Sequence, residues 1–336
     1  MSQEVRSALV LQGGGALGAY ELGAARALYE DTHFAPGLIA GVSIGAITAV
    51  LLSRPARGLT PLAALEKFWR RVAVPGIFLP PAFRSYASLF GNPSFFAPRL
   101  DYVSLASWTN IYDTAPLRVT LAELVDLDAL NDRKATPGLL VSALDVEEGE
   151  VRYFYSRDDA LTLDHIIASG SLPPSFPMTK IEGRYFWDGG LFDNTPLGAV
   201  LQRLDPSPQA ERVIYVVNLF PNKAPLPNNL LEVNERVRNL QFANKTADDV
   251  KMLRRIDEVV ELMSAIDRLP ATASLKNDPS YLAVKERNYV RVPHIVSITQ
   301  PHQVGGFDAS DFSPDTIEER AREGYAQTKQ ALDACR

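Results

Sequence analysis

The sequence predicts an α/β fold built around a mostly parallel sheet. Two consecutive strand–turn–helix units near the N-terminus carry this prediction, because strands that alternate with helices pair in parallel and bury both faces under helices. The composition agrees, since 46% of the 336 residues are apolar and 22% are charged, as in folded globular proteins. A chain of this length can form one large domain or a domain with an appendage.

The first unit begins with the apolar run 7–12, which leads into three glycines and then into the Ala- and Leu-rich segment 16–30. These segments predict a strand, a tight turn and a helix. The second unit follows at once, with a strand over 37–42, a sharp turn at Ser43 and an apolar helix over 46–53 that ends before a proline.

Further elements follow with weaker patterns. We expect a third helix over 61–72 and a last helix that begins near 314. Later strands are expected over 139–145, 151–155, 176–186, 213–219 and 290–299, with a hairpin turn at 147–150. The chain is proline-rich over 221–227 and then charged and amphipathic over 229–269, so we place a boundary near residue 225.

The segment 75–110 is rich in proline and aromatic residues and shows little periodicity. Its aromatic residues are Phe78, Phe83, Tyr86, Phe90, Phe95, Phe96, Tyr102 and Trp108. Amphipathic aromatic side chains suit a lid or a membrane-docking loop, which is the reading we adopt. Core packing beneath the sheet and a dimer contact are the alternatives.

Net charge and cysteine content indicate which partners and which cellular compartment the protein can have. A net charge of -6 and a pI near 5.4, without any basic block, argue against nucleic acid. The single Cys335 cannot form an intramolecular disulfide, and residues 1–6 lack a signal-peptide pattern. No apolar stretch is long enough to span a bilayer. We therefore expect a cytoplasmic protein whose membrane contact would be peripheral.

The basic residues of 229–269 are expected on a solvated helical face, with binding of anionic lipid as the alternative.

The pentapeptide Gly41-Val42-Ser43-Ile44-Gly45 is the strongest chemical signal, because Gly-X-Ser-X-Gly lies here between a predicted strand and a predicted helix. Such a turn exposes the serine hydroxyl, while the next backbone N–H and the helix N-terminus favour a developing oxyanion. Ser43 is therefore the candidate nucleophile, although the pattern also arises by chance.

The glycine turn, Gly13-Gly14-Gly15-Ala16-Leu17-Gly18, has two chemical interpretations. It matches a dinucleotide-binding fingerprint, but the acidic residue which that motif needs after the second strand is missing near 39–41. Alternatively, its bare N–H groups could approach a tetrahedral intermediate closely and form an oxyanion hole, which is the interpretation we favour. A glycine turn needed only for packing is the third reading.

The base that would activate the serine is either a histidine or Asp188. Of the four histidines, His294 or His302 could complete a triad in which the histidine comes last in the chain. Asp188 ends an apolar strand and precedes two glycines, at the strand end where open α/β sheets place catalytic groups. A plain Asp-Gly turn is the alternative. As sole base, Asp188 would need a pKa raised by burial beside Phe186 and Trp187.

Taken together, these motifs resemble those of patatin-like phospholipases, with blocks in the same order over about Val5 to Phe220. The blocks are the glycine turn, Gly41–Gly45, the run Ala168-Ser169-Gly170-Ser171-Leu172-Pro173-Pro174, and Trp187-Asp188-Gly189-Gly190. The resemblance implies a three-layer α/β/α fold with a mostly parallel central sheet. It also implies a catalytic domain over 1–225, with a mainly helical C-terminal extension over 226–336 packed on it, as in a bacterial subgroup of the family.

The resemblance further implies a Ser43–Asp188 dyad that cleaves lipid esters through an acyl-enzyme, with oxyanion donors among Gly13, Gly14, Gly15 and Ile44. The motif glycines are Gly18, Gly41, Gly45, Gly189 and Gly190. No metal or cofactor is implied.

One departure from the family pattern concerns the substrate. Leu17 stands where family members often carry Arg or Lys suited to a phosphate, which makes a neutral ester more credible. Headgroup, acyl length and oligomeric state, including a homo-oligomer, stay open. A non-catalytic lipid-binding or scaffold protein with the same fold is the alternative function.

Overall fold

The computed structural model describes residues 5–76, 81–101, 106–207, 210–269, 274–287, 289, 291–292, 294–301 and 308–335. Within these ranges it does not describe the side chains of residues 81, 82, 84–86, 231, 235, 244–248 and 250.

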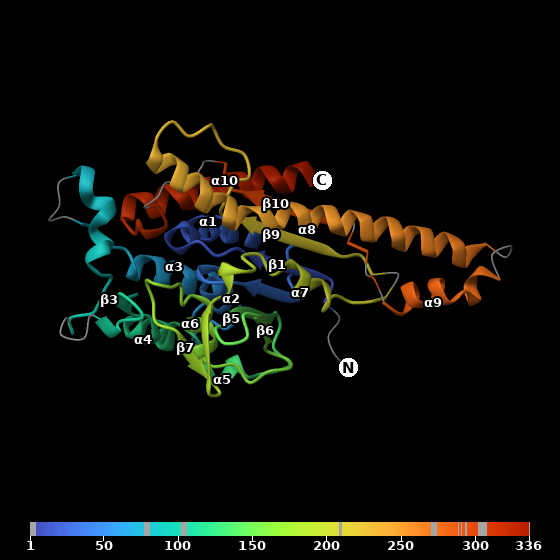
Figure 1. Cartoon of the computed structure of the whole chain (residues 1–336), viewed down its shortest axis with the longest axis horizontal. Coiled ribbons are helices and arrows are strands. Elements are labelled where there is room, and N and C mark those ends of the chain that lie inside the picture. Colours follow the sequence, from blue (N-terminus) through green and yellow to red (C-terminus); the bar gives the residue numbers. More distant parts are fainter. Residues whose placement is uncertain are drawn as a thin grey trace.

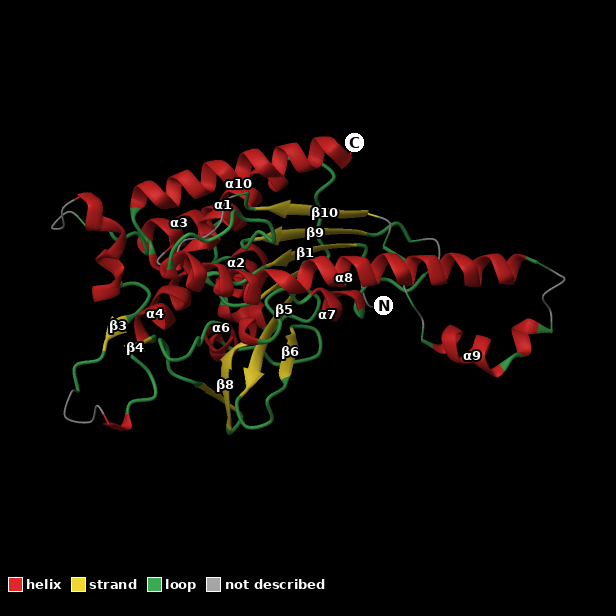
Figure 2. Cartoon of the chain, turned by 45° about the horizontal axis from the view of Figure 1, so that its top comes forward, coloured by secondary structure: helices red, strands yellow, loops and turns green. Residues whose placement is uncertain are grey.

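The centre of the fold is an eight-stranded sheet in the order β10-β9-β1-β2-β5-β8-β7, with β6 paired to β5 as well (Figure 2). Its strands are β1 (Ser7–Leu11), β2 (Leu38–Gly41), β5 (Gly138–Asp145), β6 (Val151–Tyr155), β7 (Thr179–Ile181), β8 (Arg184–Asp188), β9 (Val213–Asn218) and β10 (His294–Thr299). The five strands from β10 to β5 are parallel, whereas β6, β7 and β8 join antiparallel. The predicted mostly parallel sheet is confirmed.

Both faces of the central strands β9, β1, β2 and β5 are buried, as their apolar composition requires. In β1, Leu9 and Leu11 pack into one hydrophobic cluster, while Ala8 and Val10 pack into another on the opposite face. Side chains alternate along a strand, so a strand that is apolar at every position must be covered on both sides.

Helices supply the two outer layers (Figure 1). The larger cluster takes residues from α1 (Ala19–Tyr29), α2 (Ile44–Ser53), α3 (Pro61–Arg71), α4 (Ala115–Leu124), α5 (Leu127–Leu130), α6 (Leu163–Ser169) and α10 (Pro314–Cys335). The other face is covered by α7 (Leu197–Leu201) and by Leu253 of α8 (Leu230–Arg268). The molecule thus has the expected three-layer α/β/α architecture.

Shorter elements complete the chain. They are the hairpin of β3 (Ala97–Pro98) and β4 (Tyr112–Asp113), the helix α9 (Pro279–Glu286), and the 3₁₀ turns η1 (Gly15–Gly18), η2 (Pro81–Phe90), η4 (Gly189–Leu191), η6 (Leu275–Asn277) and η7 (Asp308–Ser310). Figures 1 and 2 show α8 crossing the body and continuing beyond it. At its far end Asp267 accepts a hydrogen bond from the Tyr281 hydroxyl of α9.

The C-terminal third packs directly on the rest of the fold. β10 pairs in parallel with β9, and α10 lies along α1 (Figure 1). The two helices approach so closely that a Cβ on Gly23 would lie 1.8 Å from the Ala321 carbonyl oxygen, and one on Gly324 would lie 2.0 Å from that of Tyr20. We propose that the chain divides into a catalytic domain up to residue 225 and an extension after it.

Candidate active site

Ser43 sits at a tight turn between β2 and α2. Its φ of 55° and ψ of −123° are unusual for a residue other than glycine and indicate backbone strain. The glycines on either side make the turn fit: a Cβ on Gly41 would lie 2.1 Å from the Gly45 carbonyl oxygen, and one on Gly45 would lie 2.5 Å from that of Leu11. The Gly-X-Ser-X-Gly spacing is therefore a steric requirement of this turn.

Strand register explains how a distant aspartate reaches Ser43. One edge of β5 pairs with both β2 and β8. Strand β6 pairs with residues of β5 that also pair with β2 and with β8, so β6 must lie along the other edge. Along the shared edge β2 ends with Gly41 opposite Val141, and β8, running the other way, ends with Asp188 opposite Ala143. The two strands run toward one another, so the residues that follow Gly41 meet the end of β8.

The C-terminal end of α6 joins the two strand ends. The Ser43 N–H lies 3.1 Å from the Ser169 carbonyl oxygen and 3.0 Å from its hydroxyl oxygen, while the Asp188 N–H donates to the Ser171 carbonyl at 3.0 Å. Ser169 and Ser171 were absent from the predicted site, although they lie in one of the motif blocks. Their role here is structural, because they fix the backbone under both candidate catalytic side chains.

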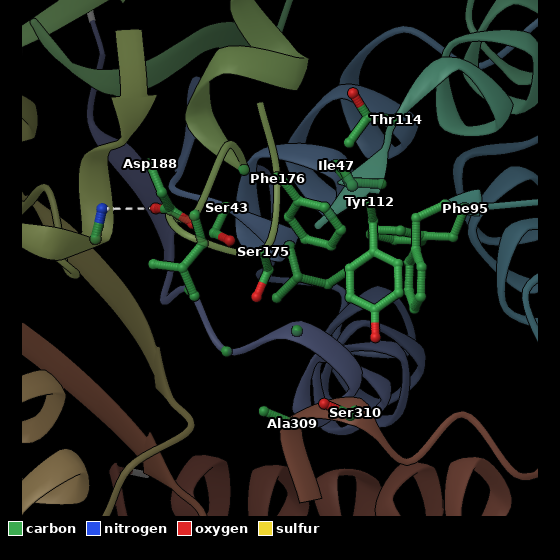
Figure 3. Close-up of a pocket in the computed structure, with 18 of the residues that line it drawn as sticks. Ser43, Ile47, Phe95, Tyr112, Thr114, Ser175, Phe176, Asp188, Ala309 and Ser310 are labelled. Carbon is green, nitrogen blue, oxygen red and sulfur yellow. Dashed lines mark hydrogen bonds between the residues drawn. The ribbon is translucent and has the colours of Figure 1, made fainter. Parts of the chain in front are cut away.

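Asp188 is buried and hydrogen-bonded to Ser43. Burial raises its pKa to about 7, and the hydrogen bonds from the Ser43 hydroxyl and the Gly190 N–H offset part of that rise. The Gly190 N–H lies 2.7 Å from the carboxylate, which is the dashed contact in Figure 3. A carboxylate with a pKa near neutrality can accept a proton from a hydroxyl group far better than an ordinary aspartate can.

The predicted oxyanion donors lie beside this pair. Gly13, Gly14, Gly15 and Ile44 border the same cavity as Ser43 and Asp188. Within the described ranges, the N–H groups of these four residues donate to no protein acceptor. The N-terminus of α2 adds positive potential at the same point. The arrangement can therefore stabilise negative charge next to the Ser43 hydroxyl.

Asn194 is a site residue that the motif analysis missed. Its side-chain N–H group donates to the Gly13 carbonyl at 3.1 Å, and its side-chain oxygen would lie 2.6 Å from a Cβ on Gly190. Asn194 is buried and thus connects the glycine turn to the segment that carries Asp188. The sequence signal was weak, because an Asp-Asn-Thr-Pro run reads as an ordinary turn.

The cavity has a volume of about 460 Å³, within the range of small-molecule sites. Its walls are mainly apolar and include Ile47, Leu89, Phe95, Phe96, Tyr112, Leu117, Ile167, Phe176, Phe220, Phe242 and Phe312. Figure 3 shows Ser43 and Asp188 side by side, with Phe176 nearest to them, Tyr112 and Phe95 further across the cavity, and Ala309 and Ser310 along another side. An apolar cavity beside the candidate nucleophile suits a fatty acyl chain.

The aromatic segment 75–110 contains both buried and exposed side chains, so neither the lid nor the core-packing interpretation describes all of it. Phe95 and Phe96 are buried and line the cavity, whereas Phe83 and Phe90 are exposed. Phe78, Tyr102 and the side chain of Tyr86 lie outside the described residues.

The histidine alternative finds no support among the described residues. His33 is exposed beside Asp31, and His294 is exposed on the edge strand β10. His165 is buried, where its ring accepts from the Thr162 N–H at the start of α6, and burial lowers its pKa. None of these three borders the cavity, and His302 lies outside the described residues.

The described residues contain no group of three His, Cys, Asp or Glu side chains placed to hold a metal ion. None of the described helices combines the length and the apolarity that crossing a bilayer requires.

Protein-family models match the part of the chain that carries these motifs and also its C-terminal part. A family model for patatin-like phospholipases matches residues 9–201, more than half of the chain, and a second model, DUF3734, described as patatin phospholipase, matches residues 240–336. No curated protein matches the sequence.

Two solved structures are similar to the chain. One is VipD from Legionella pneumophila, at 15% identity and a TM-score of 0.43, with 98% of this chain and 67% of that chain covered. The other is the heterodimeric ExoU–SpcU complex from the type III secretion system of Pseudomonas aeruginosa, at 19% identity and a TM-score of 0.33, with 85% and 66% covered. The chain thus spans about two thirds of the length of each.

Proposed function

Because the chain belongs to the patatin-like phospholipase family, we propose that it hydrolyses carboxylic esters of lipids through an acyl-enzyme formed on Ser43. The observation that carries the proposal is the hydrogen bond between Ser43 and the buried Asp188, whose pKa is about 7. It gives the serine a base without a histidine. The apolar cavity next to the pair supports a fatty acyl substrate.

In the first half of the reaction, the Ser43 oxygen attacks the ester carbonyl carbon while Asp188 takes the hydroxyl proton. The resulting oxyanion is held by the N–H groups of Gly14, Gly15 and Ile44, with Gly13 shaping the turn. The intermediate then collapses, the bond to the alcohol breaks, and Asp188 returns the proton to the leaving alcohol.

In the second half, Asp188 takes a proton from a water molecule that attacks the acyl-enzyme carbonyl. The second oxyanion collapses, the bond to the Ser43 oxygen breaks, and the proton on Asp188 returns to Ser43. One ester and one water molecule thus give one fatty acid and one alcohol. The reaction needs no metal or cofactor.

The test uses a p-nitrophenyl ester of medium chain length. Ser43→Ala and Asp188→Asn should each abolish p-nitrophenol release while the circular dichroism spectrum is unchanged. The matched controls are Ser53→Ala at the other end of α2 and Asp128→Asn at an exposed position, which should retain activity. Activity that survives in both dyad variants would refute the proposal.

The alternative function, a lipid-binding protein without catalysis, has a separate signature. A fluorophosphonate probe should label wild-type protein at Ser43 and leave Ser43→Ala unlabelled, because only an activated serine reacts. A well-folded wild-type protein that resists the probe would favour the binding protein.

We also propose peripheral membrane contact through the exposed part of 75–110. Phe90 is 76% exposed and follows Leu89, which lines the cavity, so apolar surface continues from the cavity to the outside. Co-sedimentation with phosphatidylglycerol vesicles should fall in Phe90→Ser, and unchanged co-sedimentation would count against this contact.

A further inference from the structure

The side chain of Asn194 lies between the glycine turn and the turn that follows Asp188. A Cβ atom on Gly13 would lie 2.5 Å from the Asn194 side-chain oxygen, and one on Gly190 would lie 2.6 Å from the same atom. Such distances are too short for any carbon atom, so neither position can carry a side chain while Asn194 stays in place. The carboxamide group of Asn194 therefore packs against both turns at once.

The residues on either side of Asn194 are anchored. The carboxylate of Asp193 accepts a hydrogen bond from the hydroxyl group of Tyr153. The hydroxyl group of Thr195 accepts from the side-chain N–H group of Gln12 at 3.1 Å. Asp193, Asn194 and Thr195 are all buried. The Asn194 side chain thus extends from a fixed backbone and has little freedom to take another position.

Three peptide units carry the proposed oxyanion donors, and two of them are held by backbone hydrogen bonds to their carbonyl oxygens. The carbonyl of Gly14, whose unit carries the Gly15 N–H, accepts from the Leu17 N–H at 3.2 Å. The carbonyl of Ser43, whose unit carries the Ile44 N–H, accepts from a backbone N–H in the first turn of α2 at 3.0 Å. These two donors are therefore oriented by the turns in which they lie.

The third unit, which joins Gly13 to Gly14, is held by a side chain instead. Among the described residues, the Gly13 carbonyl accepts no backbone hydrogen bond, and the Asn194 side-chain N–H donates to it at 3.1 Å. Because a carbonyl oxygen can only accept, the carboxamide nitrogen must face it. The unit is planar and trans, so its carbonyl and the Gly14 N–H point in opposite directions. The hydrogen bond from Asn194 therefore fixes the direction of the Gly14 N–H.

A glycine on each side makes the Gly13–Gly14 unit easy to rotate. Glycine has no Cβ and adopts a wide range of φ and ψ, so rotation of this plane meets little steric resistance. After such a rotation, the Gly13 carbonyl oxygen would take the place of the Gly14 N–H beside the cavity. An oxygen atom there would repel a developing oxyanion instead of stabilising it.

We propose that Asn194 is a positioning residue, which holds the Gly13–Gly14 peptide unit in the orientation in which the Gly14 N–H stabilises the oxyanion. The inference rests on the proposed function, because it concerns the same reaction. Asn194 follows Asp188 closely in the chain, so one short segment carries the base and orients a donor of the oxyanion hole. The hydrogen bond from Asn194 acts on the transition state through Gly14, so its loss should lower kcat and leave KM nearly unchanged.

The test compares an ester with its thionoester, p-nitrophenyl octanoate and O-p-nitrophenyl thionooctanoate. A thiocarbonyl sulfur accepts hydrogen bonds much more weakly than a carbonyl oxygen, so it gains little from an oxyanion hole. Asn194→Ala should lower kcat for the ester about 10- to 100-fold, with KM changed less than about threefold. The same substitution should affect the thionoester far less, so the preference for the ester should fall by a similar factor.

Asn194→Leu is the second variant, because leucine has the branching of asparagine and fills the space of the carboxamide but cannot donate a hydrogen bond. It excludes a water molecule that could replace the amide in Asn194→Ala. The matched control is Tyr153→Phe, which removes a hydrogen bond to the neighbouring Asp193 and leaves the contact with Gly13 intact. This control should keep the wild-type kcat and the wild-type preference for the ester.

The preference for the ester does not depend on the fraction of folded protein, since both substrates report on the same active molecules. An equal loss on both substrates, or an unchanged kcat in both Asn194 variants, would overturn the positioning role and leave the esterase proposal standing. A lost preference in Tyr153→Phe would assign the effect to the packing of residues 193–195 and would overturn it too. Wild-type protein that cleaves neither substrate would instead refute the proposed function.

Discussion

At the scale of single residues, the proposed chemistry depends on the protonation of Asp188. Its pKa is raised to about 7, mainly by burial, and it must be ionised to accept the Ser43 proton. We therefore expect kcat/KM to rise with pH, about tenfold per unit below pH 7, and to level off above it. A profile measured from pH 5 to 9 on the p-nitrophenyl ester checks this.

The control for that profile is a titration of folding. Circular dichroism over the same pH range should show intact structure, so that the loss of activity at low pH reports on Asp188 and not on unfolding. A midpoint near 4, the usual value for an exposed aspartate, or a flat profile would mean that burial does not tune this carboxylate.

At this scale, a site residue can be predicted from the sequence only when a short motif around it marks it. Ser43 and Asp188 could be singled out because each lies in a short motif at a strand end. Asn194 could not, since its contact with Gly13 joins residues 181 positions apart and nothing near Asn194 marks it. Arg238 lines the cavity, but the sequence shows it only as one charge on a helical face, because a pattern within one helix does not show what that helix packs against.

At the scale of elements, the early units were predictable and a later hairpin was not. The first two strand–turn–helix units lie where the periodicity placed them. The single strand expected over 176–186 is instead the hairpin of β7 and β8, which turns at Glu182 and Gly183, both with positive φ. Glutamate rarely adopts that conformation, so the usual turn signal was missing. β8 consequently continues to Asp188 and delivers it to the site.

The contact between α1 and α10 could not be predicted from the sequence either, because it depends on two glycines that come together only in the folded protein. A Cβ on Gly324 would lie 2.0 Å from the Tyr20 carbonyl oxygen, so the helices must separate to admit it. Gly324→Ala should lower the free energy of unfolding by about 1–3 kcal/mol, measured by urea denaturation.

Gly198 of α7 provides the matched control for that substitution. It is helical and exposed, and a Cβ there would meet nothing within 4 Å. Gly198→Ala should leave stability unchanged or raise it by up to about 1 kcal/mol, through helix propensity alone. If the two variants were equally stable, the close approach of α1 and α10 would not be a feature of the folded protein.

At the scale of the whole molecule, the C-terminal third supports the site as well as the sheet. The buried Arg320 of α10 donates to the carbonyl of Ala16 in the glycine turn at 3.2 Å, and also to the Asp311 carbonyl. Ala309 and Ser310 line the cavity. A boundary near 225 could be placed from composition, but composition does not show that a later strand returns to the sheet beside β9.

A chain that ends at residue 225 tests how far the first part stands alone. Its loss of β10 would turn β9 into an exposed edge strand, and its loss of α10 would uncover the apolar face of α1. We therefore expect this truncated protein to aggregate or to unfold without a cooperative transition, and to lack esterase activity. Co-expression with a separate chain of residues 226–336 should restore both properties if non-covalent contacts are what the truncation removes. A soluble 1–225 chain with full activity and a sharp thermal transition would instead establish an autonomous catalytic domain.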